Sequence, residues 1–426
     1  MGLSHLLFPT LVHEVIEAIP LVASLPGHWN ARRAYQGVLG LVRAGTRMSI
    51  KGMLERQFDL GLFPDFTDCP AASGFSQARH LLRTSDFQAG WGRAKSLVGA
   101  VVSPPGKRRW IACDGAWMVT SRSRSAQQRW ETPTGGKLPQ ALVITAWEVR
   151  TRLPVGFCVM PGGVGERAGV DELLPHLRAG DVALMDRGFP SDRLLGALVD
   201  QDVDVVMRMT TGASAWAETT AFVDSGEDDA VLPVEIRDPD GQLRRIPLRF
   251  IRRSFPRGRP KSGQSRELMV IATTLLDAAA MSANTILRRY EERWGVETAY
   301  REMKITFAIE HFHSEDADFI VQELYALMTW LCMAAAMEAQ VQQLLIAKRG
   351  PIDPTDPHRW QINRTHLFKQ VDRAFWAACV PGGWEKHLPT YEQHCRNLVR
   401  SAQKRRPGRS RPRERLAPFG HFAGGK

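Results

Sequence analysis

The sequence predicts an α/β fold in which helices flank a mixed β-sheet, with a helical amino-terminal domain before it and a basic tail after it. Three observations support this prediction. Short apolar runs of strand length alternate with helical patterns between residues 105 and 208. Apolar residues recur every three or four positions through much of residues 1–100, as in amphipathic helices. A turn-rich, β-leaning segment over residues 209–278 then interrupts the alternation.

The composition is that of a soluble protein with an unevenly spread charge. At 426 residues, the chain is too long for one compact core, so two to four domains are expected. Of a net charge of +11, most lies in residues 396–426, where there are ten Lys/Arg and one Asp/Glu. Such a basic tail predicts nucleic acid as a partner, and the alternative is a solubilising tail.

Cysteine usage and the apolar segments indicate a cytoplasmic protein. The six cysteines contain no C-x-x-C pair, which argues against a zinc ribbon or a disulfide scaffold and fits a reducing cytosol. The amino terminus lacks the basic region of a secretory signal. The most apolar helix candidate, Phe319 to Leu345, contains Gln322, Glu323 and Glu338, and is therefore predicted to be a buried core helix without a membrane partner.

Residues 1–100 are predicted to form a helical DNA-binding domain. In SGFSQAR, a glycine turn leads into a helix that carries Ser76, Gln77 and Arg79. These polar side chains at the start of a helix suit a recognition helix that contacts DNA. An ordinary capped helix explains the same pattern.

Residues 105–208 are predicted to form the first part of a catalytic core. The pattern is three strands, a helix, a strand, a helix and a strand, an order that resembles the ribonuclease-H-like fold. The strands are Trp110–Cys113, Ala141–Val149, Leu153–Met160, Val182–Met185 and Val203–Met207, with helices near Val170–Leu177 and Pro190–Val199.

Residues 209–278 are predicted to be an inserted β-rich subdomain. Its β-leaning stretches are Ala230–Ile236, Ile246–Ile251 and Leu268–Thr273. Arg252 and Arg253 open a basic loop that is a candidate DNA contact and continues through Arg257, Arg259, Lys261 and Arg266. The second part of the core follows over residues 279–345, then a carboxy-terminal helical region over residues 346–395 and the tail over residues 396–426.

The segment RRYEERWGVETAYREMK is predicted to be one helix. At about 100° per residue, Tyr290, Arg293, Glu297 and Lys304 fall, together with Arg301, on one arc of roughly 80°. Two guanidiniums, an ammonium and a phenol beside a single carboxylate suit an anionic partner, with a metal held by the carboxylate. The alternative is a solvated face with ion pairs four residues apart.

Three carboxylates are the candidate catalytic and metal-binding groups. Asp114 is predicted to end the first strand and Asp186 the fourth, and these strands are neighbours in a ribonuclease-H-like sheet. A helix packed across that edge would bring Glu297 beside them. Three ionised carboxylates in one pocket repel, and two divalent ions would offset the charge. A strand-terminal Asp before Gly is, by itself, usually a turn residue.

At these residues the chain resembles the DDE-class insertion-sequence transposases, specifically the subgroup with a Tyr-x2-Arg-x3-Glu-x6-Lys signature and a β-rich insertion. The signature spacing matches at Tyr290, Arg293, Glu297 and Lys304. Asp114-Gly115 resembles the first-aspartate motif of the family, and the DRGF segment that begins at Asp186 resembles the second. The resemblance covers residues 60 to 345.

The resemblance implies a DNA transposase that moves an insertion-sequence element by cut-and-paste, through hydrolytic nicking, hairpin formation and opening, and strand transfer. It implies two Mg²⁺ ions, with Mn²⁺ as a substitute, held by Asp114, Asp186 and Glu297. Tyr290, Arg293 and Lys304 would grip DNA phosphates. The implied partners are double-stranded DNA (the element's terminal inverted repeats and its target) and a second copy of the chain when two ends are paired. The implied location is the nucleoid of a prokaryotic host.

Aromatic and histidine side chains near the signature leave alternatives open. Trp294 or Trp216 could receive a base flipped out of the bent strand, and core packing is the other role for each. His311 and His313 could form a transition-metal pair, but a structural or DNA-facing role is preferred because hard carboxylates already supply a magnesium site.

Two competing functions remain at this point. A catalytically silent DNA-binding protein on the same scaffold would gain nothing from carboxylates placed against phosphates. A generic ribonuclease-H-like nuclease would explain the three acids but not the Tyr/Arg/Lys stripe. The short segment after residue 345 leaves dimerisation unassigned, and the loose match of the amino-terminal region leaves recognition of the terminal repeats unassigned.

Overall fold

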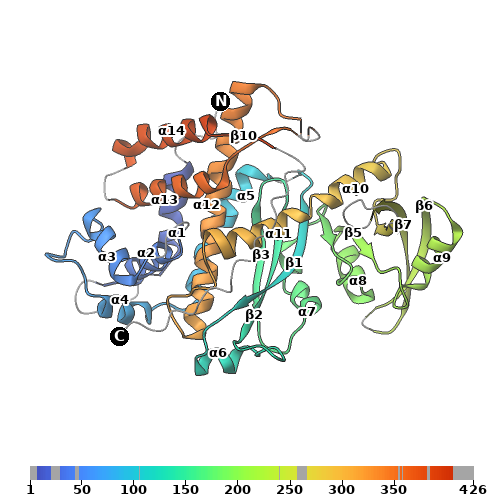
Figure 1. Ribbon diagram of the computed structural model, residues 1–426, viewed down its shortest axis with the longest axis horizontal. Coiled ribbons are helices and arrows are strands. Elements are labelled where there is room, and N and C mark those ends of the chain that lie inside the picture. The colour runs from blue at the N-terminus through green and yellow to red at the C-terminus, as the bar shows by residue number, and fades with distance from the viewer. Residues whose placement is uncertain are drawn as a thin grey trace.

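A mixed sheet of eight strands forms the centre of the computed structural model, in the order β3-β2-β1-β4-β5-β8-β7-β6 (Figure 1). The structure describes residues 7–20, 29–43, 48–104, 106–238, 240–256, 266–353, 356, 358–380 and 384–405. β1, β4 and β5 run parallel, and the other neighbouring pairs are antiparallel. The strands are β1 (Trp110–Val119), β2 (Gln140–Glu148), β3 (Leu153–Met160), β4 (Val182–Met185), β5 (Asp204–Met209), β6 (Asp229–Arg237), β7 (Leu243–Pro256) and β8 (Arg266–Thr273).

The predicted fold class is confirmed, and all five strands predicted between residues 105 and 208 are present. Two details differ. β1 does not end at Asp114 but continues to Val119, because it keeps pairing with β2 beyond the point where its pairing with β4 stops. The single helix predicted near Val170–Leu177 is instead α7 (Glu166–Asp171) followed by a short 3₁₀ turn, η1 (Leu174–His176).

The β-rich insertion extends the main sheet and does not form a sheet of its own. β8 pairs with β5 in antiparallel register, from Val206 opposite Thr273 to Met209 opposite Val270. β7 and β6 follow outward, so that the insertion forms the right-hand lobe in Figure 1 together with α8 (Asp192–Asp200) and α9 (Ala217–Ser225). The backbone that carries Asp186 is therefore continuous, through β4 and β5, with the inserted strands.

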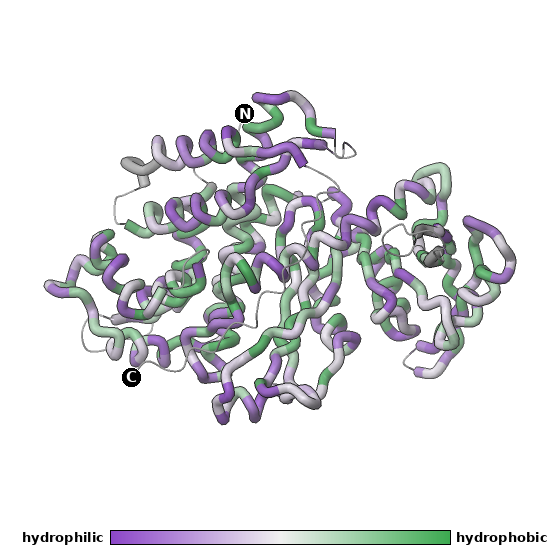
Figure 2. The backbone as a smooth tube through the Cα atoms, in the orientation of Figure 1, coloured by the Kyte–Doolittle hydropathy of each residue, from purple (hydrophilic) through white to green (hydrophobic). Residues whose placement is uncertain are grey.

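The amino-terminal helices share their core with the carboxy-terminal ones (Figure 2). The Trp330 indole donates a hydrogen bond to the Leu39 carbonyl at 2.8 Å, and Asp372 pairs with Arg43 and Arg56 at 3.4 and 3.0 Å. The predicted domain of residues 1–100 is thus packed onto the end of the chain. These helices are α1 (Leu7–Glu17), α2 (Ala31–Leu41), α3 (Ile50–Asp59), α4 (Ala72–Arg79), α5 (Thr84–Val102), α12 (Ala317–Arg349), α13 (Arg364–Cys379) and α14 (Trp384–Arg400).

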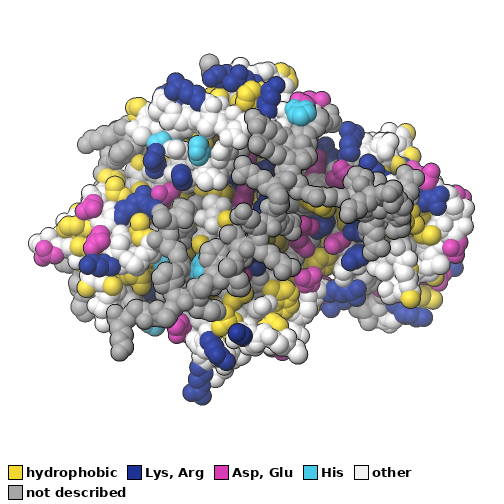
Figure 3. Space-filling view, in the orientation of Figure 1, with side chains coloured by type: hydrophobic (Ala, Val, Ile, Leu, Met, Phe, Trp, Pro, Cys, Tyr) yellow, Lys and Arg dark blue, Asp and Glu magenta, His cyan; other side chains and the backbone are white. Residues whose placement is uncertain are grey.

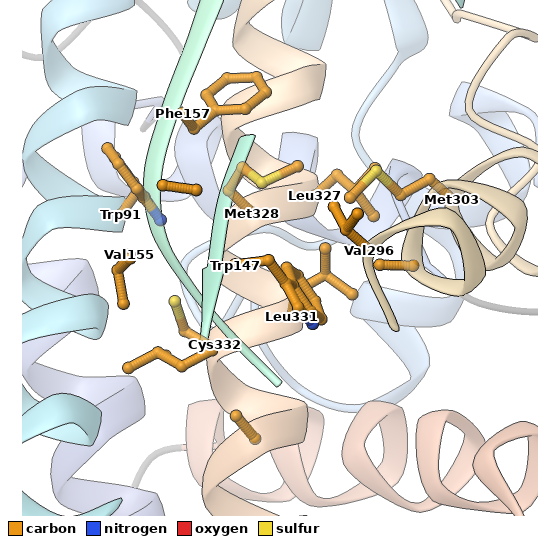
Figure 4. Packing of buried hydrophobic residues seen from close by; sticks show 14 of the residues in the cluster. Trp91, Trp147, Val155, Phe157, Val296, Met303, Leu327, Met328, Leu331 and Cys332 are labelled. Atoms are coloured by element: carbon orange, nitrogen blue, oxygen red, sulfur yellow. The ribbon is translucent and has the colours of Figure 1, made fainter. Parts of the chain in front are cut away.

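The long helix α12 is the core helix of this assembly. Among the described residues it is the one helix long and apolar enough to span a membrane, but nearly all of its most apolar stretch is buried inside the molecule, as in the core helix of a soluble protein. Figure 4 shows Leu327 and Leu331 of α12 packed beside Trp147 of β2 and beside Val296 and Met303 from the signature segment. The sheet, α12 and the signature segment therefore share one apolar core.

The first residues of the predicted basic tail are structured. Arg396 to Arg400 complete α14, and β10 (Gln403–Lys404) pairs with β9 (Trp360–Gln361). Residues 406–426, which carry the rest of the predicted tail, lie outside the described residues. On the face shown in Figure 3, Lys and Arg side chains are spread over both lobes with Asp and Glu among them.

Candidate active site

Asp114 and Asp186 lie at the same end of the parallel β1–β4 pair. The last paired residues are Cys113 and Met185, so the next residue on each strand is one of the two aspartates. Residues Trp110 to Cys113 and the whole of β4 are buried, whereas both aspartates are partly exposed. The sheet register therefore brings two carboxylates, 72 positions apart in the chain, to one edge.

The signature segment is not the continuous helix that the sequence predicts. α10 (Ala283–Glu291) ends at a turn through Glu292 and Arg293, and α11 (Trp294–Arg301) begins directly after it. The turn is closed by hydrogen bonds from Gly295 to Glu292 and from Val296 to Arg293, at 2.9 and 3.0 Å. A π-helical stretch, η2 (Glu302–Thr306), follows α11. Figure 1 shows α10 leading from the right-hand lobe to α11, which packs against β1 and whose Tyr300 hydroxyl donates to the Asp114 carbonyl at 2.6 Å.

The Arg293 guanidinium joins the three predicted acids. Its nitrogens lie 3.8 Å from Asp114, 3.9 Å from Asp186 and 3.1 Å from Glu297. The side chain is only 6% exposed, and its Nε has no hydrogen-bond partner among the described residues. The structure thus brings together all three predicted catalytic residues, with an internal cation between them.

Tyr290 completes the buried side of this cluster. Its hydroxyl donates to Asp186 at 3.4 Å, Arg208 approaches the same carboxylate at 4.0 Å, and burial raises the pKa of the phenol. The sequence predicts DNA phosphate contacts for Tyr290 and Arg293. This requires correction for the conformation described, because the two residues are 4% and 5% exposed and face the carboxylates. Tyr290 lies on the buried face of α10 with Ile286 and Leu287, and Arg293 lies in the turn that leads into α11.

The Asp114 carboxyl is held in an environment that opposes its charge. Burial raises its pKa to about 6, the Arg293 guanidinium counteracts this rise, and the charges of Glu166 and Glu297 add to it. The Arg293 guanidinium therefore offsets only part of the rise that burial and the neighbouring carboxylates cause in the pKa of Asp114. An additional cation would lower this pKa further.

Glu166 is a fourth carboxylate at this edge, and the sequence analysis missed it. It is the first residue of α7 and is half-buried; burial and the charge of Asp186 raise its pKa. Its position in the sequence, an acidic residue in the first turn of a short helix, carries no signal beyond helix capping. Only the packing of α7 against β1 and β2 reveals it.

Lys304 lies apart from the acids, on η2. Its ammonium donates to the Trp117 carbonyl at 2.6 Å and to the Glu310 carboxylate at 3.0 Å, and Glu310 also accepts from the Val119 amide. The Trp117 side chain beside it is 45% exposed. Glu302, at the start of η2, accepts two hydrogen bonds from Arg364, from its Nε at 2.6 Å and from its Nη2 at 2.8 Å. Arg364 also pairs with Glu338 of α12.

Of the other predicted contacts on this segment, Trp294 is 68% exposed and Arg301 is exposed. Trp216 packs partly buried against the core, which matches the structural alternative for that residue. His313 bonds to Glu323 at 3.2 Å and to the Met48 carbonyl at 3.0 Å, so its role in this conformation is structural.

The predicted recognition helix is α4, and it needs correction at Arg79. This guanidinium is 3% exposed and binds Glu323 at 3.1 Å, Gln322 at 3.1 Å and the Phe319 carbonyl at 2.8 Å. It is the partner of a buried charge on α12 and not a DNA contact in this conformation. Ser76 and Gln77 remain exposed on the same helix.

In the insertion, Arg252 pairs with Asp228 at 2.8 Å and Arg253 with Glu291 at 3.1 Å. Both are therefore neutralised within the protein in this conformation, although Arg253 stays 46% exposed. Arg257, Arg259 and Lys261 lie outside the described residues.

The side chains at this site are of the chemical type that binds a hard divalent cation. Carboxylate oxygens from Asp114, Asp186 and Glu297 are the donors that Mg²⁺ prefers. Among the described residues, however, no three such side chains are grouped closely enough to hold one ion, since the Arg293 guanidinium lies between them. Binding of a cation would require this guanidinium to give up its central position.

Acidic residues gathered at the edge of a ribonuclease-H-like sheet are the arrangement expected of proteins that carry out phosphoryl transfer on nucleic acids. Residues 105–333 match the family described as "Transposase DDE domain", and the chain belongs to this family. It is accordingly a DNA-cleaving transposase, a class that generally uses divalent metals. No curated protein shows significant similarity to the chain.

The chain also resembles a solved structure, the cryo-EM structure of the piggyBac transposase synaptic complex with hairpin DNA. The TM-score is 0.50 at 13% sequence identity, and the match covers 94% of this chain and 85% of the other. At this identity the similarity concerns the fold.

Proposed function

We propose that this transposase excises and inserts an insertion-sequence element by cut-and-paste, with Asp114, Asp186 and Glu297 as its active-site carboxylates. The observation that carries the proposal is the convergence of these three acids, from β1, the end of β4 and α11, on the single guanidinium of Arg293. All three lie within the residues matched by the family.

In this proposal the three carboxylates hold two divalent ions, Mg²⁺ or its substitute Mn²⁺. Bound there, the ions would supply Lewis-acid activation of a phosphodiester and a deprotonated nucleophile. Tyr290 would fix the orientation of Asp186 through its hydroxyl, and Arg293 would balance the charge of the carboxylates before the ions bind. The proposed role of Tyr290 and Arg293 is therefore to organise the acids, in place of phosphate binding.

The DNA strand would lie over the exposed side of α11 and η2. Trp294 and Arg301 are exposed there, and Lys304 is one-third exposed beside the exposed Trp117. Cations and aromatic rings together suit phosphates and unstacked bases. The similar piggyBac structure is a synaptic complex with hairpin DNA; for this chain we propose the same intermediate, formed when a freed 3′-hydroxyl attacks the opposite strand, and pairing of two chains on two DNA ends.

The test uses linear duplexes built from the DNA that flanks the gene, with a scrambled duplex as the control and Mg²⁺ present. Hairpin-capped products at the element's end support the proposal. Unordered nicking of both duplexes would instead indicate a generic nuclease. Binding of the duplex by the protein without any cleavage would indicate a catalytically silent DNA-binding protein.

Replacing Lys304 by Ala should weaken duplex binding and lower the salt dependence of the affinity by about 0.9 in the log–log slope, the value for one phosphate contact. Fluorescence anisotropy over a range of salt concentrations measures both quantities. Lys348→Ala removes an exposed lysine from the far end of α12 and serves as the matched control. An unchanged slope in the Lys304 variant would place this residue away from the DNA.

A further inference from the structure

Glu297 reaches the active-site edge without a contact of its own to the sheet. Within the residues that the structure describes, its carboxylate bonds only to Arg293, four residues earlier in the same segment. A cation can bind between the acids only if the Arg293 guanidinium gives up its central position. The placement of Glu297 relative to Asp114 therefore depends on other contacts of α11.

Apolar packing holds α11 against the sheet but does not by itself fix its position along β1. The buried residues of α11 are Val296, Ala299 and Tyr300, and Figure 4 shows Val296 near Trp147 of β2 and Leu331 of α12. Attraction between apolar surfaces is non-directional. It therefore constrains the axial position of a helix less sharply than a hydrogen bond, which weakens steeply when its angle or length changes.

The Tyr300 hydroxyl provides such a directional contact. The side chain is 6% exposed, and its hydroxyl donates to the backbone carbonyl of Asp114 at 2.6 Å. It also lies 3.0 Å from the hydroxyl of Thr145, the fully buried residue opposite Asp114 on β2. Among the described residues, the bond to Asp114 is the one hydrogen bond between α11 and β1.

Tyr300 and Glu297 lie on the same side of α11. They are three residues apart, which places them about 60° apart around the helix and about one turn apart along it. One helical turn thus connects the Glu297 carboxylate to the hydroxyl that is bonded to Asp114. Moving Glu297 away from Asp114 requires this bond to bend or break.

We propose that Tyr300 is a positioning residue: its bond to the Asp114 carbonyl sets the placement of Glu297 relative to Asp114 for strand cleavage. This inference rests on the proposed function, because it takes Asp114 and Glu297 as active-site carboxylates. In this role the buried hydroxyl acts through the two acids and does not touch DNA. The alternative is that the hydroxyl only satisfies its own need for a hydrogen bond, as buried tyrosines usually do. That alternative predicts a loss of stability alone.

The test replaces Tyr300 by Phe, which keeps the ring and its packing and removes only the hydroxyl. The single-turnover cleavage rate at saturating protein and with Mg²⁺ should fall about 10- to 100-fold, the cost of a small misplacement of catalytic groups. The affinity for the same duplex should stay unchanged, because the hydroxyl is buried. The full-length protein is used for both measurements.

Tyr325→Phe is the matched control. Tyr325 of α12 is also 6% exposed, and its hydroxyl accepts a hydrogen bond from Gln88 of α5 at 3.0 Å. This variant loses an equally buried hydroxyl but should cleave normally. Thermal unfolding of each variant sets a temperature at which all of them are folded. Equal losses of cleavage in the two variants, or no loss in Tyr300→Phe, would overturn the inference.

Hydrogen exchange gives a readout that does not depend on activity. Removing the Tyr300 hydroxyl should speed the exchange of backbone amides in α11, while β5 and β8 exchange as in the unaltered protein. Thr145→Val disturbs the same hydroxyl from the side of β2 and should give a weaker form of this pattern. It also tests the inference if Tyr300→Phe does not fold. Unchanged exchange in α11 would contradict the anchoring role.

Glu297→Gln separates this inference from the proposed function. If Glu297→Gln abolishes cleavage and Tyr300→Phe cleaves normally, the active-site carboxylates stand and Tyr300 is not a positioning residue. If Glu297→Gln cleaves normally, the proposed function fails and the inference fails with it. In the Glu297→Gln background, Tyr300→Phe should add little further loss, because it acts through Glu297; fully additive losses would count against the inference.

Discussion

Replacing Glu297 by Gln lowers strand cleavage by about 10³-fold or more, equivalent to about 4 kcal/mol of activation free energy, while duplex binding is retained. The amide keeps the shape of the side chain but removes the negative charge that a divalent cation needs. Glu297 is half exposed and its local contact is with Arg293, so the fold does not depend on it. Loss of a carboxylate beside DNA phosphates should leave binding unchanged or slightly tighter.

Glu291→Gln is the matched control, because Glu291 lies six residues earlier in the same segment and pairs with Arg253 on the surface. Cleavage of an end-labelled duplex and binding of the same duplex are measured side by side. Substantial residual cutting by the Glu297 variant would remove this residue from the active site. Equal loss in the control would show that the segment tolerates no change of charge.

Arg293→Met destabilises the metal-free protein by about 2–3 kcal/mol, a value below that for fully buried ion pairs because the carboxylates are partly exposed. The methionine fills a similar volume but leaves Asp114, Asp186 and Glu297 without the cation that they share. Divalent ions should restore much of the stability, since they replace the lost charge. Urea unfolding with a chelator and with Mn²⁺ measures both effects.

The stability of the Arg293 variant should also depend on pH in a defined direction. Burial already raises the pKa of Asp114 to about 6, and loss of the guanidinium raises this pKa further. The folded state then binds a proton more readily than the unfolded chain, so stability falls as pH rises from 4 through 6 and recovers on acidification. Arg253→Met, which breaks a surface pair, should change stability by less than about 0.5 kcal/mol. A variant as stable as the unaltered protein at pH 7 without metal would contradict the shared-cation arrangement.

The sequence predicts the sheet and its two aspartates because strands buried on both faces are continuous apolar runs with distinct ends. β4 shows this most clearly: it is four apolar residues followed by Asp186. The sequence does not predict the end of β1, because Asp114-Gly115 has the local character of a strand end. The apolar residues that follow it, Ala116 to Val119, are shown to continue the strand only by their pairing with β2.

The remaining differences arise from long-range packing. A regular helical wheel places Arg293 and Lys304 on one arc, but the turn before α11 and the π-helical stretch after it separate them, and no local residue signals either change. Arg79 has the local features of a DNA contact, and only its distant partner Glu323 shows that it is buried. Glu166 is likewise visible only once α7 is placed against Gly115.

Arg364 of α13 pairs with Glu302, so the helices after α12 support the π-helical stretch that carries Lys304. One guanidinium braces the turn that carries Lys304 against α12, because it holds Glu302 and Glu338 at once. A chain shortened after α12 would lack Arg364. Glu302 and Glu338 would then repel each other without the guanidinium that they share, and the π-helical stretch that carries Lys304 would lose this contact. If Lys304 contacts DNA as proposed, a protein truncated after α12 should bind DNA more weakly even though Asp114, Asp186 and Glu297 are all present.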